Sequence, residues 1–220
     1  MSYDQIILID KPAGITSFGV VARVRRKLSE QARKRIKVGH TGTLDPFATG
    51  LMVILTGKKT KDALVYSKSD KVYEATIKLG ATSTTGDPEG IISSNSGRLV
   101  PDKSQIEQTL NSFVGEITQI PPIYSAIKVD GERAYKLARK GRTPKIPERK
   151  VTIYSLELLS YSYPELKIRT HVSSGTYIRS LAEDIGRKLG TGAYTTELRR
   201  TKIGKYDIKD ALPLAEYINI

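Results

Sequence analysis

The sequence predicts an α+β fold with a mixed, largely antiparallel sheet flanked by helices. Strand-like segments outnumber helical ones, and the two kinds do not alternate in the strict rhythm that builds a parallel sheet. The 220 residues, 39% of them hydrophobic and 27% charged, can bury a sizeable core. No repeat and no linker rich in serine and glycine divides the chain. We therefore expect a single domain over residues 1–220.

Hydrophobic periodicity and turn residues mark the expected elements in order along the chain. Strands are predicted at residues 5–9, 71–80, 125–129, 149–159, 165–172 and 195–203, with a short apolar strand or helix end at 51–55. Helices are predicted at about 16–28, 58–66, 102–113, 132–140 and 175–189, with a short one near 214–217. Residues 81–95 are rich in Thr, Ser, Gly, Asp and Pro, and we expect them to form a loop.

Composition narrows the possible functions. With no cysteine, the chain has no disulfide, no thiolate zinc site and no cysteine nucleophile, and two histidines argue against a multi-histidine metal site. No apolar run is long enough to span a bilayer, and we expect no signal peptide at the N-terminus. These features favour a cytoplasmic enzyme or binding protein.

The charge indicates a polyanionic partner. Lys and Arg number 36 against 23 acidic residues, a net charge of +13. A generally basic proteome would also give this total, but the charges cluster in residues 23–37, 128–150 and 187–205. Such clusters suit contacts to nucleic-acid phosphates. No helix combines a basic face with bulky aromatics, so RNA or DNA ranks above a membrane surface.

The most unusual stretch is residues 37–50, which holds three glycines, a proline, hydroxyl side chains and one carboxylate, Asp45. Glycine serves where the backbone takes a positive φ or approaches another group closely. Pro46 fixes its own φ and pushes Asp45 toward an extended conformation. An isolated Asp-Pro would simply cap a turn. Among so many special backbone positions, a rigid loop that presents one acid is the better interpretation.

Two further segments contain residues that could act with Asp45. Arg179 is expected one turn into a helix that starts near Gly175, where it could pair with a carboxylate and keep it ionised. The alternative for Arg179 is a surface ion pair with Glu183 at i+4. Tyr73 lies in a predicted strand, where an aromatic residue usually belongs to the core. A flipped base, however, needs an aromatic face to stack on.

These segments resemble the signature of the TruB family of tRNA pseudouridine synthases. The likeness rests on several stretches that occur in the family's order and together are highly specific. The matching stretches are Asp10-Lys11-Pro12-x-Gly14, residues 39–46 with Ala48-Thr49-Gly50, Lys71-x-Tyr73, Pro121-Pro122-x-Tyr124-Ser125-Ala126, residues 174–179 and Leu198-Arg199-Arg200.

The resemblance implies a reaction that needs no cofactor and no metal. The enzyme would isomerise the uridine at position 55 of the tRNA T-loop to pseudouridine, breaking the N1–C1′ bond, rotating the uracil and joining C5 to C1′. Asp45 matches the essential aspartate. An aspartate with an ordinary pKa near ~3.9 is ionised at neutral pH and needs no base to activate it. Both covalent addition by Asp45 and removal of the C2′ proton fit this requirement.

The resemblance also implies roles for residues around the base. Tyr73 matches the tyrosine that stacks on the base and takes the C5 proton, and Arg179 matches the arginine that pairs with the aspartate. Lys11 matches a lysine that supports the active-site loops, and Leu198 matches an apolar contact to the flipped base. The substrate-binding set also includes His40, which matches a histidine that contacts the reshaped T-loop, and Tyr177. Without the resemblance, a lone histidine would be assigned a structural role.

The chain departs from the family pattern at two points. Bacterial members usually continue into a C-terminal PUA domain, and we expect none before the end at Ile220. The usual Cys-Ser-Lys-Gly-Thr-Tyr is replaced by residues 172–177, Val-Ser-Ser-Gly-Thr-Tyr, which lacks one cation. Residues 128–149 are expected to grip the T-arm and to be mobile in the absence of RNA. We expect a monomer.

Two alternatives to a stand-alone synthase follow from the sequence. The first is a T-arm-binding tRNA chaperone in which catalysis is secondary or lost. The presence of Asp45, Tyr73 and Arg179 together favours catalysis, because binding alone does not require that trio. The second is a synthase that acts in a guide-RNA complex, which ranks lower because the chain lacks the extensions such a scaffold would need.

Overall fold

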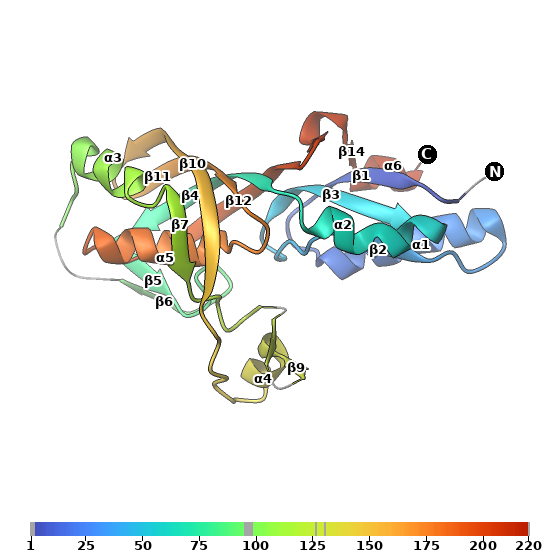
Figure 1. The fold of residues 1–220 in the computed structure, drawn as a ribbon, viewed down its shortest axis with the longest axis horizontal. Helices are drawn as coiled ribbons and strands as arrows, with labels where there is room; N and C mark the ends of the chain where they lie inside the picture. Colours follow the sequence, from blue (N-terminus) through green and yellow to red (C-terminus); the bar gives the residue numbers. More distant parts are fainter. Residues whose placement is uncertain (1–2, 95–98, 126, 130, 220) are drawn as a thin grey trace. The chain divides into compact units, whose positions relative to one another are not determined.

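The structure is a computed structural model that describes residues 3–94, 99–125, 127–129 and 131–219. Its strands and helices form the predicted α+β fold, in which most strand pairs are antiparallel (Figure 1). The chain divides into two compact units. Unit 1 comprises Met1–Glu74 and Leu198–Ile220, and unit 2 comprises Ala75–Glu197. The single domain expected from the sequence stays a prediction.

Unit 1 is built on strands in the order β14-β1-β3-β12. Strand β1 pairs in antiparallel fashion with β3 and in parallel with β14, and β12 runs parallel to β3 at one short contact. Strands β2 and β13 add antiparallel pairs to β3 and β12. The bounds are β1 Ile6–Lys11, β2 Val38–His40, β3 Thr49–Thr56, β12 Ala193–Ile203, β13 Tyr206–Asp207 and β14 Leu212–Pro213.

Strand β3 forms the centre of unit 1. The apolar run 51–55, which the sequence left open between strand and helix end, lies within this strand, and all five of its residues are at most 1% exposed. A strand buried on both faces needs a continuous apolar run rather than an alternating one. Leu51, Val53 and Leu55 form one cluster with Ile203 of β12. The strand therefore anchors the loop that precedes it.

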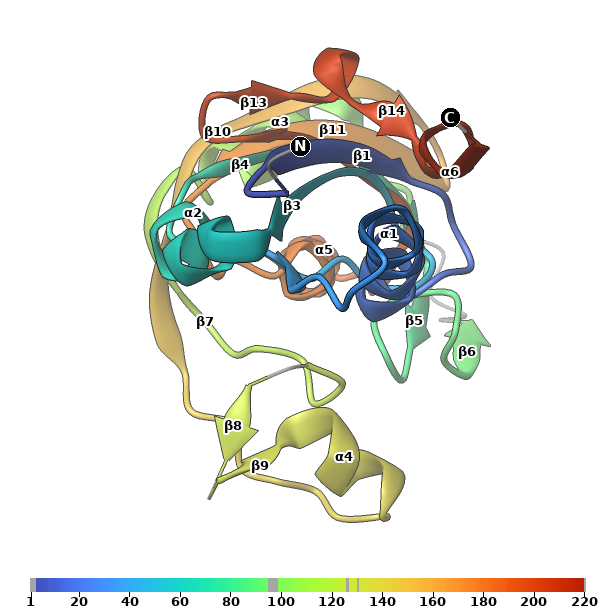
Figure 2. The same ribbon diagram turned by 90° about the vertical axis from the view of Figure 1, so that its right-hand side faces the viewer.

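Helix α1 (Ser17–Ala32) covers one face of the unit 1 strands (Figure 2). Thr16 caps it by accepting a hydrogen bond from the Gly19 amide at 2.9 Å, close to the expected start at about residue 16. The helix extends four residues beyond the expected end at Leu28. The apolar stripe on its buried side consists of Val20, Val21, Val24 and Leu28. Shorter elements of this unit are η1 Gly57–Asp62, α2 Ala63–Ser67, η2 Ile208–Asp210 and α6 Leu214–Asn219.

Unit 2 contains strands in the order β4-β11-β10-β7, joined by antiparallel pairs between β11, β10 and β7. Two hairpins, β5 with β6 and β8 with β9, stand apart from this sheet. The bounds are β4 Lys71–Leu79, β5 Ala81–Ser83, β6 Ile92–Ser94, β7 Gly115–Gln119, β8 Lys128–Val129, β9 Glu132–Arg133, β10 Arg149–Ser162 and β11 Glu165–Val172. The first half of β4 belongs to unit 1 and the second half to unit 2.

Helix α5 (Ile178–Lys188) lies against the sheet of unit 2 and buries Leu181, Ala182 and Ile185 (Figure 2). Helix α3 (Lys103–Asn111) starts with a capping box in which Asp102 and Gln105 exchange hydrogen bonds. Helix α4 is short and spans Ala134–Arg139.

Several sequence predictions for unit 2 need correction. The expected loop at 81–95 contains the hairpin β5–β6, and Asn95 lies outside the described residues. Strand β7 was missed, and the strand expected at 125–129 is only Lys128–Val129 among the described residues. Helix α5 begins at Ile178 rather than Gly175, because Gly175 takes a left-handed φ of 87° that no helix accommodates.

Candidate active site

The Asp45 loop, residues 41–48, joins β2 to β3 in unit 1. Asp45 is half-buried, and its carbonyl accepts a hydrogen bond from the Ala48 amide at 3.2 Å. The next carbonyl, that of Pro46, accepts from the Gly14 amide at 2.8 Å and from Lys11 Nζ at 3.1 Å. Lys11 is fully buried. The backbone beside Asp45 is thus fixed by groups from the N-terminal segment.

Helix α1 holds the loop at the residue before Asp45. The Ser17 hydroxyl donates to the Leu44 carbonyl at 2.8 Å and accepts from the Leu44 amide at 2.7 Å. Ser17 and Leu44 are each 3% exposed, so neither hydrogen bond competes with water. This pair ties the Asp45 loop to the first residue of α1.

Arg200 of β12 anchors the start of the loop. Its side chain is 1% exposed and donates to three carbonyls: Leu51 at 2.8 Å, Gly42 at 3.1 Å and Thr43 at 3.3 Å. The planar guanidinium carries several donors at fixed angles, so one side chain can hold three acceptors. The sequence placed Arg200 in a basic cluster that would contact phosphates. Its burial makes that expectation wrong for this residue.

A second buried cation lies beside Arg200. Lys71 is 6% exposed and donates from Nζ to the carbonyls of Ser67 and Ser69. Burial and the nearby Arg200 lower the pKa of Lys71 to about 8, partly opposed by Asp70. A Cβ placed on Gly42 would lie 3.5 Å from Arg200 Nη1 and 3.8 Å from Lys71 Cε, so both cations flank the loop at this residue.

Gly50 allows the strand after the loop to pack closely on β12. Its φ is 107°, and a Cβ there would lie 2.3 Å from the Arg200 carbonyl oxygen and 2.7 Å from its amide nitrogen. Any side chain would push the two strands apart. Gly39 and Gly42 do not take a positive φ. The expectation of special backbone geometry therefore holds for Gly50 among the three glycines of this stretch.

His40 ends strand β2, directly before the loop. Burial, and to a lesser extent Arg200, lowers the pKa of the imidazole, so the ring is neutral at neutral pH. Its Nδ1 is buried and has no hydrogen-bond partner in the described part of the chain. A neutral ring of this kind offers a hydrogen-bonding nitrogen without adding to the positive charge of Arg200.

Tyr73 and Leu198 share strand faces with the two buried cations. On β4, Tyr73 is two residues from Lys71, and on β12, Leu198 is two residues from Arg200, so each pair lies on one face of its strand. Tyr73 is 7% exposed and Leu198 is 8% exposed. The structure thus gives Tyr73 a buried position, which agrees with the core alternative as well as with a role at the site.

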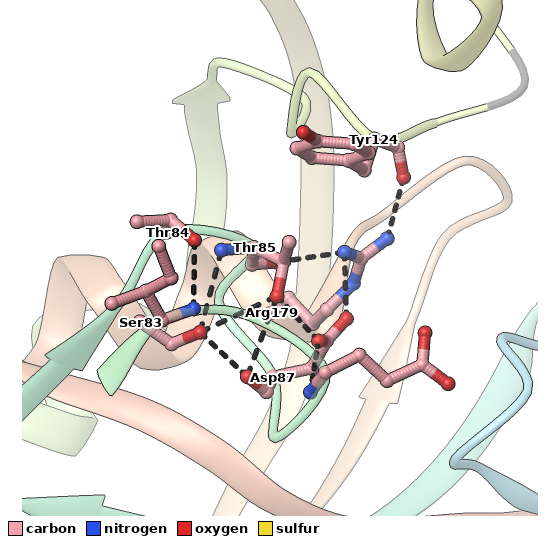
Figure 3. Close-up of polar contacts among 8 residues, drawn as sticks. Ser83, Thr84, Thr85, Asp87, Tyr124 and Arg179 are labelled. Carbon is pink, nitrogen blue, oxygen red and sulfur yellow. Dashed lines mark hydrogen bonds and ion pairs between the residues drawn. The ribbon is translucent and has the colours of Figure 1, made fainter. Parts of the chain in front are cut away.

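Arg179 lies in unit 2 at the start of α5 and is 3% exposed. Nη1 donates to Asp87 Oδ2 at 3.0 Å and to the Thr85 carbonyl at 2.7 Å, and Nη2 donates to the Tyr124 carbonyl at 2.9 Å (Figure 3). The alternative of a surface arginine is wrong, because Arg179 is buried, and it forms an ion pair with Asp87. Its pairing with Asp45 stays a prediction.

Asp87 is a residue that the sequence interpretation missed. It is 3% exposed, and its Oδ1 accepts from the Thr85 hydroxyl at 2.5 Å and from the Glu89 amide at 3.0 Å (Figure 3). Its carbonyl accepts from the Ser83 hydroxyl at 2.6 Å. These bonds, together with the ion pair to Arg179, fold residues 83–89 into a fixed turn. We call this group of residues the Arg179 cluster.

Tyr177 immediately precedes α5 and is held by two neighbours. Gln119, which is fully buried, accepts from the Tyr177 amide at 2.8 Å and donates to its carbonyl at 3.0 Å. The Arg149 guanidinium lies 4.8 Å from the centre of the Tyr177 ring and also bonds the Gly175 carbonyl. Of the predicted site residues, Tyr177 and Arg179 lie in unit 2, and Lys11, His40, Asp45, Tyr73 and Leu198 lie in unit 1.

The part of the chain that the structure describes lacks two features that would point to other functions. It contains no group of three or more His, Asp or Glu side chains placed to hold a metal ion. None of its helices is long and apolar enough to cross a membrane.

Comparisons over the whole chain place it in the class of pseudouridylate synthases. Residues 25–178 match the model of the TruB family pseudouridylate synthase N-terminal domain, and residues 179–218 match that of the tRNA pseudouridylate synthase B C-terminal domain. The chain belongs to the TruB family of pseudouridylate synthases. The resemblance noted in the sequence is confirmed.

Individual relatives cover nearly the whole chain. It is 47% identical over 219 residues to the tRNA pseudouridine synthase B of Aquifex aeolicus, covering 98% of this chain and 74% of that protein. It is 45% identical over 214 residues to that of Bacteroides fragilis, covering 97% and 92%. Among solved structures, a chain of a Cbf5-Nop10-Gar1 complex matches with a TM-score of 0.73 and 29% identity. That match covers 97% of this chain and about half (53%) of the other.

Proposed function

We propose that this chain isomerises uridine 55 in the T-loop of tRNA to pseudouridine. The observation that carries the proposal is the Asp45 loop, in which one half-buried acid is presented by a backbone that Lys11, Ser17 and Arg200 hold at several points. Family membership supports the reaction, and the relatives named tRNA pseudouridine synthase B support the substrate. Rigid placement of one acid suits a reaction whose difficulty is orientation rather than activation of a nucleophile.

The reaction is internally balanced. The N1–C1′ bond of the uridine breaks, the uracil rotates in place, and a C5–C1′ bond forms while the C5 proton moves to N1. No atom or electron is gained or lost, so neither a cofactor nor a metal is required by the stoichiometry. Asp45, ionised at neutral pH, acts at the sugar or the ring, and the target base is flipped out of the T-loop at a cost of about a few kcal/mol.

The other residues of the predicted set surround this step. Tyr73 stacks on the base and takes the C5 proton, and Leu198 contacts the flipped base. Arg179 pairs with Asp45, and the ion pair with Asp87 holds Arg179 in one rotamer for that purpose. Lys11 supports the loop, while His40 and Tyr177 contact the T-loop. The neutral state of the His40 ring makes it a hydrogen-bonding contact rather than a phosphate clamp.

The proposal extends to partners and place of action. The substrate is the T-arm of tRNA, which residues 128–149 grip, and the enzyme works as a monomer in the cytoplasm. The charge of +13 supports a polyanionic substrate and disfavours self-association.

Mapping of pseudouridine in unmodified tRNA transcripts after incubation with this protein tests the proposal. We expect one product, at position 55, and none in a matched transcript with cytidine at that position. A product outside the T-loop would overturn the choice of substrate. Tight binding of the transcript with no product would favour the T-arm-binding chaperone instead.

A further inference from the structure

A strongly basic surface at the far end of α1 takes no part in the site described above. Residues 23–37 hold eight cations against one acid, Glu30. Six of these cations are exposed to solvent, and we call them the α1 basic surface. They are Arg23, Arg26, Arg33, Lys34, Arg35 and Lys37.

An ordered turn builds this surface. Arg33 caps the C-terminus of α1 in a left-handed conformation with φ of 50°, a position that glycine usually takes. The Lys34 amide donates to the Ser29 carbonyl at 3.2 Å, and the Ile36 amide donates to the Ser29 hydroxyl at 3.0 Å. Ile36 itself is 6% exposed and anchors the turn. The cations are therefore held on a defined backbone rather than carried on a loose tail.

Nothing in the described residues neutralises these charges. None of the six makes an ion pair there, and the Arg23 side chain bonds only the Gly19 carbonyl of its own helix. By contrast, Arg25 bonds the Val38 carbonyl, and Lys27 bonds carbonyls at the end of α6. Within the described chain, Arg25 and Lys27 thus bond carbonyls of other elements, whereas the other six cations have no acidic partner.

The helix dipole explains only part of this arrangement. Cations just beyond a helix C-terminus gain about 0.3–1 kcal/mol from the dipole, which covers Arg33 and Lys34. The effect fades within one turn, so it does not reach Arg23 or Arg26. A left-handed non-glycine residue costs about 1–2 kcal/mol, and adjacent like charges repel each other. A polyanionic partner would offset these costs.

The surface has a defined position relative to the catalytic loop, because both belong to unit 1. Ser17, the first residue of α1, bonds Leu44 next to Asp45. The helix has 16 residues and is therefore about 24 Å long. Figure 1 shows α1 running along the strands of unit 1, with the basic turn at its end. The C-terminal end of α1 is thus about 24 Å along the helix from Ser17 and the Leu44 that it bonds, so Arg33 and Lys34 are too far away to touch a nucleotide held at Asp45.

We propose that the α1 basic surface binds the phosphate backbone of the same tRNA outside the T-arm. The inference rests on the proposed function for the position of the target base. Arg and Lys side chains on a solvent-facing helix and turn match the charge of a phosphate backbone, and contacts to phosphates position a nucleic acid without reading its bases. The contact strengthens binding of whole tRNA without affecting the chemical step.

The test compares whole tRNA with an isolated T-arm hairpin. A triple variant, Lys34→Gln with Arg35→Gln and Lys37→Gln, removes three charges and leaves the cap residue Arg33 intact. Its matched control removes three exposed cations of unit 1 that lie outside the three basic clusters, through Lys61→Gln, Lys68→Gln and Lys209→Gln. Dissociation constants are measured for both RNAs across a range of salt concentrations, and thermal unfolding checks that each variant is folded.

For the triple variant we expect whole tRNA to bind about tenfold more weakly at moderate salt, with a salt slope reduced by about 2. Binding of the hairpin, and turnover at saturating tRNA, stay as in the wild type, and the control variant changes neither RNA. Unchanged binding of whole tRNA would overturn the proposal. An equal loss on the hairpin would also overturn it, because the surface would then contact the T-arm itself.

Two further outcomes complete the test. One shows whether the partner is a membrane rather than tRNA, and the other separates failure of this proposal from failure of the proposed function. Binding to vesicles containing phosphatidylserine that depends on the three charges, with tRNA binding unchanged, would assign the surface to a membrane and contradict the proposal. If the wild type forms no pseudouridine, the proposed function fails, but the difference in binding between whole tRNA and hairpin still tests the surface.

Discussion

The Asp45 loop and the Arg179 cluster are each held in one conformation, but by different kinds of interaction. The Asp45 loop is held through its backbone, because buried cations and a serine bond the carbonyls of Gly42, Thr43, Leu44 and Pro46. The Arg179 cluster is held through side chains, because a buried aspartate pairs with a buried arginine. The hydrogen bonds to the carbonyls hold the Asp45 loop through its backbone rather than through the Asp45 carboxylate. Without Asp87, the buried charge of Arg179 would lose this carboxylate and keep the Thr85 and Tyr124 carbonyls as acceptors.

The largest expected effect tests the ion pair. Asp87→Ala leaves Arg179 buried without its carboxylate, and we expect unit 2 to lose about 3–5 kcal/mol in the free energy of unfolding. Urea unfolding measures this loss. Asp184→Ala is the matched control, because it breaks the more exposed pair with Arg187 on the same helix and should cost less than about 1 kcal/mol. Equal losses in the two variants would show that the Arg179 cluster is not held by its ion pair.

A smaller effect is expected for the carbonyl-held loop. Arg200→Met removes the donors to three carbonyls, and we expect a loss of about 2–3 kcal/mol in stability together with slower turnover. The rate of the reaction at saturating protein reports a misplaced Asp45, whereas the dissociation constant for RNA reports weaker binding. Measuring both separates the two causes. Arg199→Met is the control on the same strand, since its partner Asp10 lies nearer the surface. Turnover at the wild-type rate in a folded Arg200→Met protein would show that Arg200 does not position the loop.

The smallest effect concerns the buried lysine beside the loop. The pKa of Lys71 is about 8 in the folded protein and 10.5 when unperturbed, so between these values the unfolded state binds more protons. Stability from this group therefore rises with pH over that window. We expect the wild type to gain about 1–2 kcal/mol relative to Lys71→Met between pH 7.5 and 9.5. If the difference in unfolding free energy between the two proteins stays constant with pH, the pKa of Lys71 is not lowered in the folded state.

The sequence was informative where local backbone chemistry carries the signal. Gly50 and Pro46 marked the Asp45 loop, and the apolar run 51–55 marked the strand that anchors it. Helices were expected from about residues 16 and 102, and Thr16 and Asp102 are the N-caps in the structure, because capping needs only residues close in the chain. These features depend on neighbours within a few positions, so periodicity and residue type suffice to predict them.

The sequence failed where partners are distant along the chain. Asp87 lies in a Gly-Asp-Pro turn inside a segment rich in Thr and Ser, and nothing local indicates that its partner is 92 residues away. Arg200 and Arg199 are adjacent in the same basic run, yet one is buried among carbonyls and the other pairs with Asp10. Strand alternation sends neighbouring residues to opposite faces. Composition alone treated both as phosphate contacts.

The most direct test of Asp45 as the catalytic aspartate is the rate of Asp45→Asn under single-turnover conditions, with RNA binding measured on the same samples. The substitution keeps the size of the side chain and removes its charge. We predict that pseudouridine formation is abolished while the dissociation constant for tRNA stays within about tenfold of the wild type, because the loop backbone remains held by Lys11, Ser17 and Arg200. Residual turnover near the wild-type rate would contradict the assignment of Asp45.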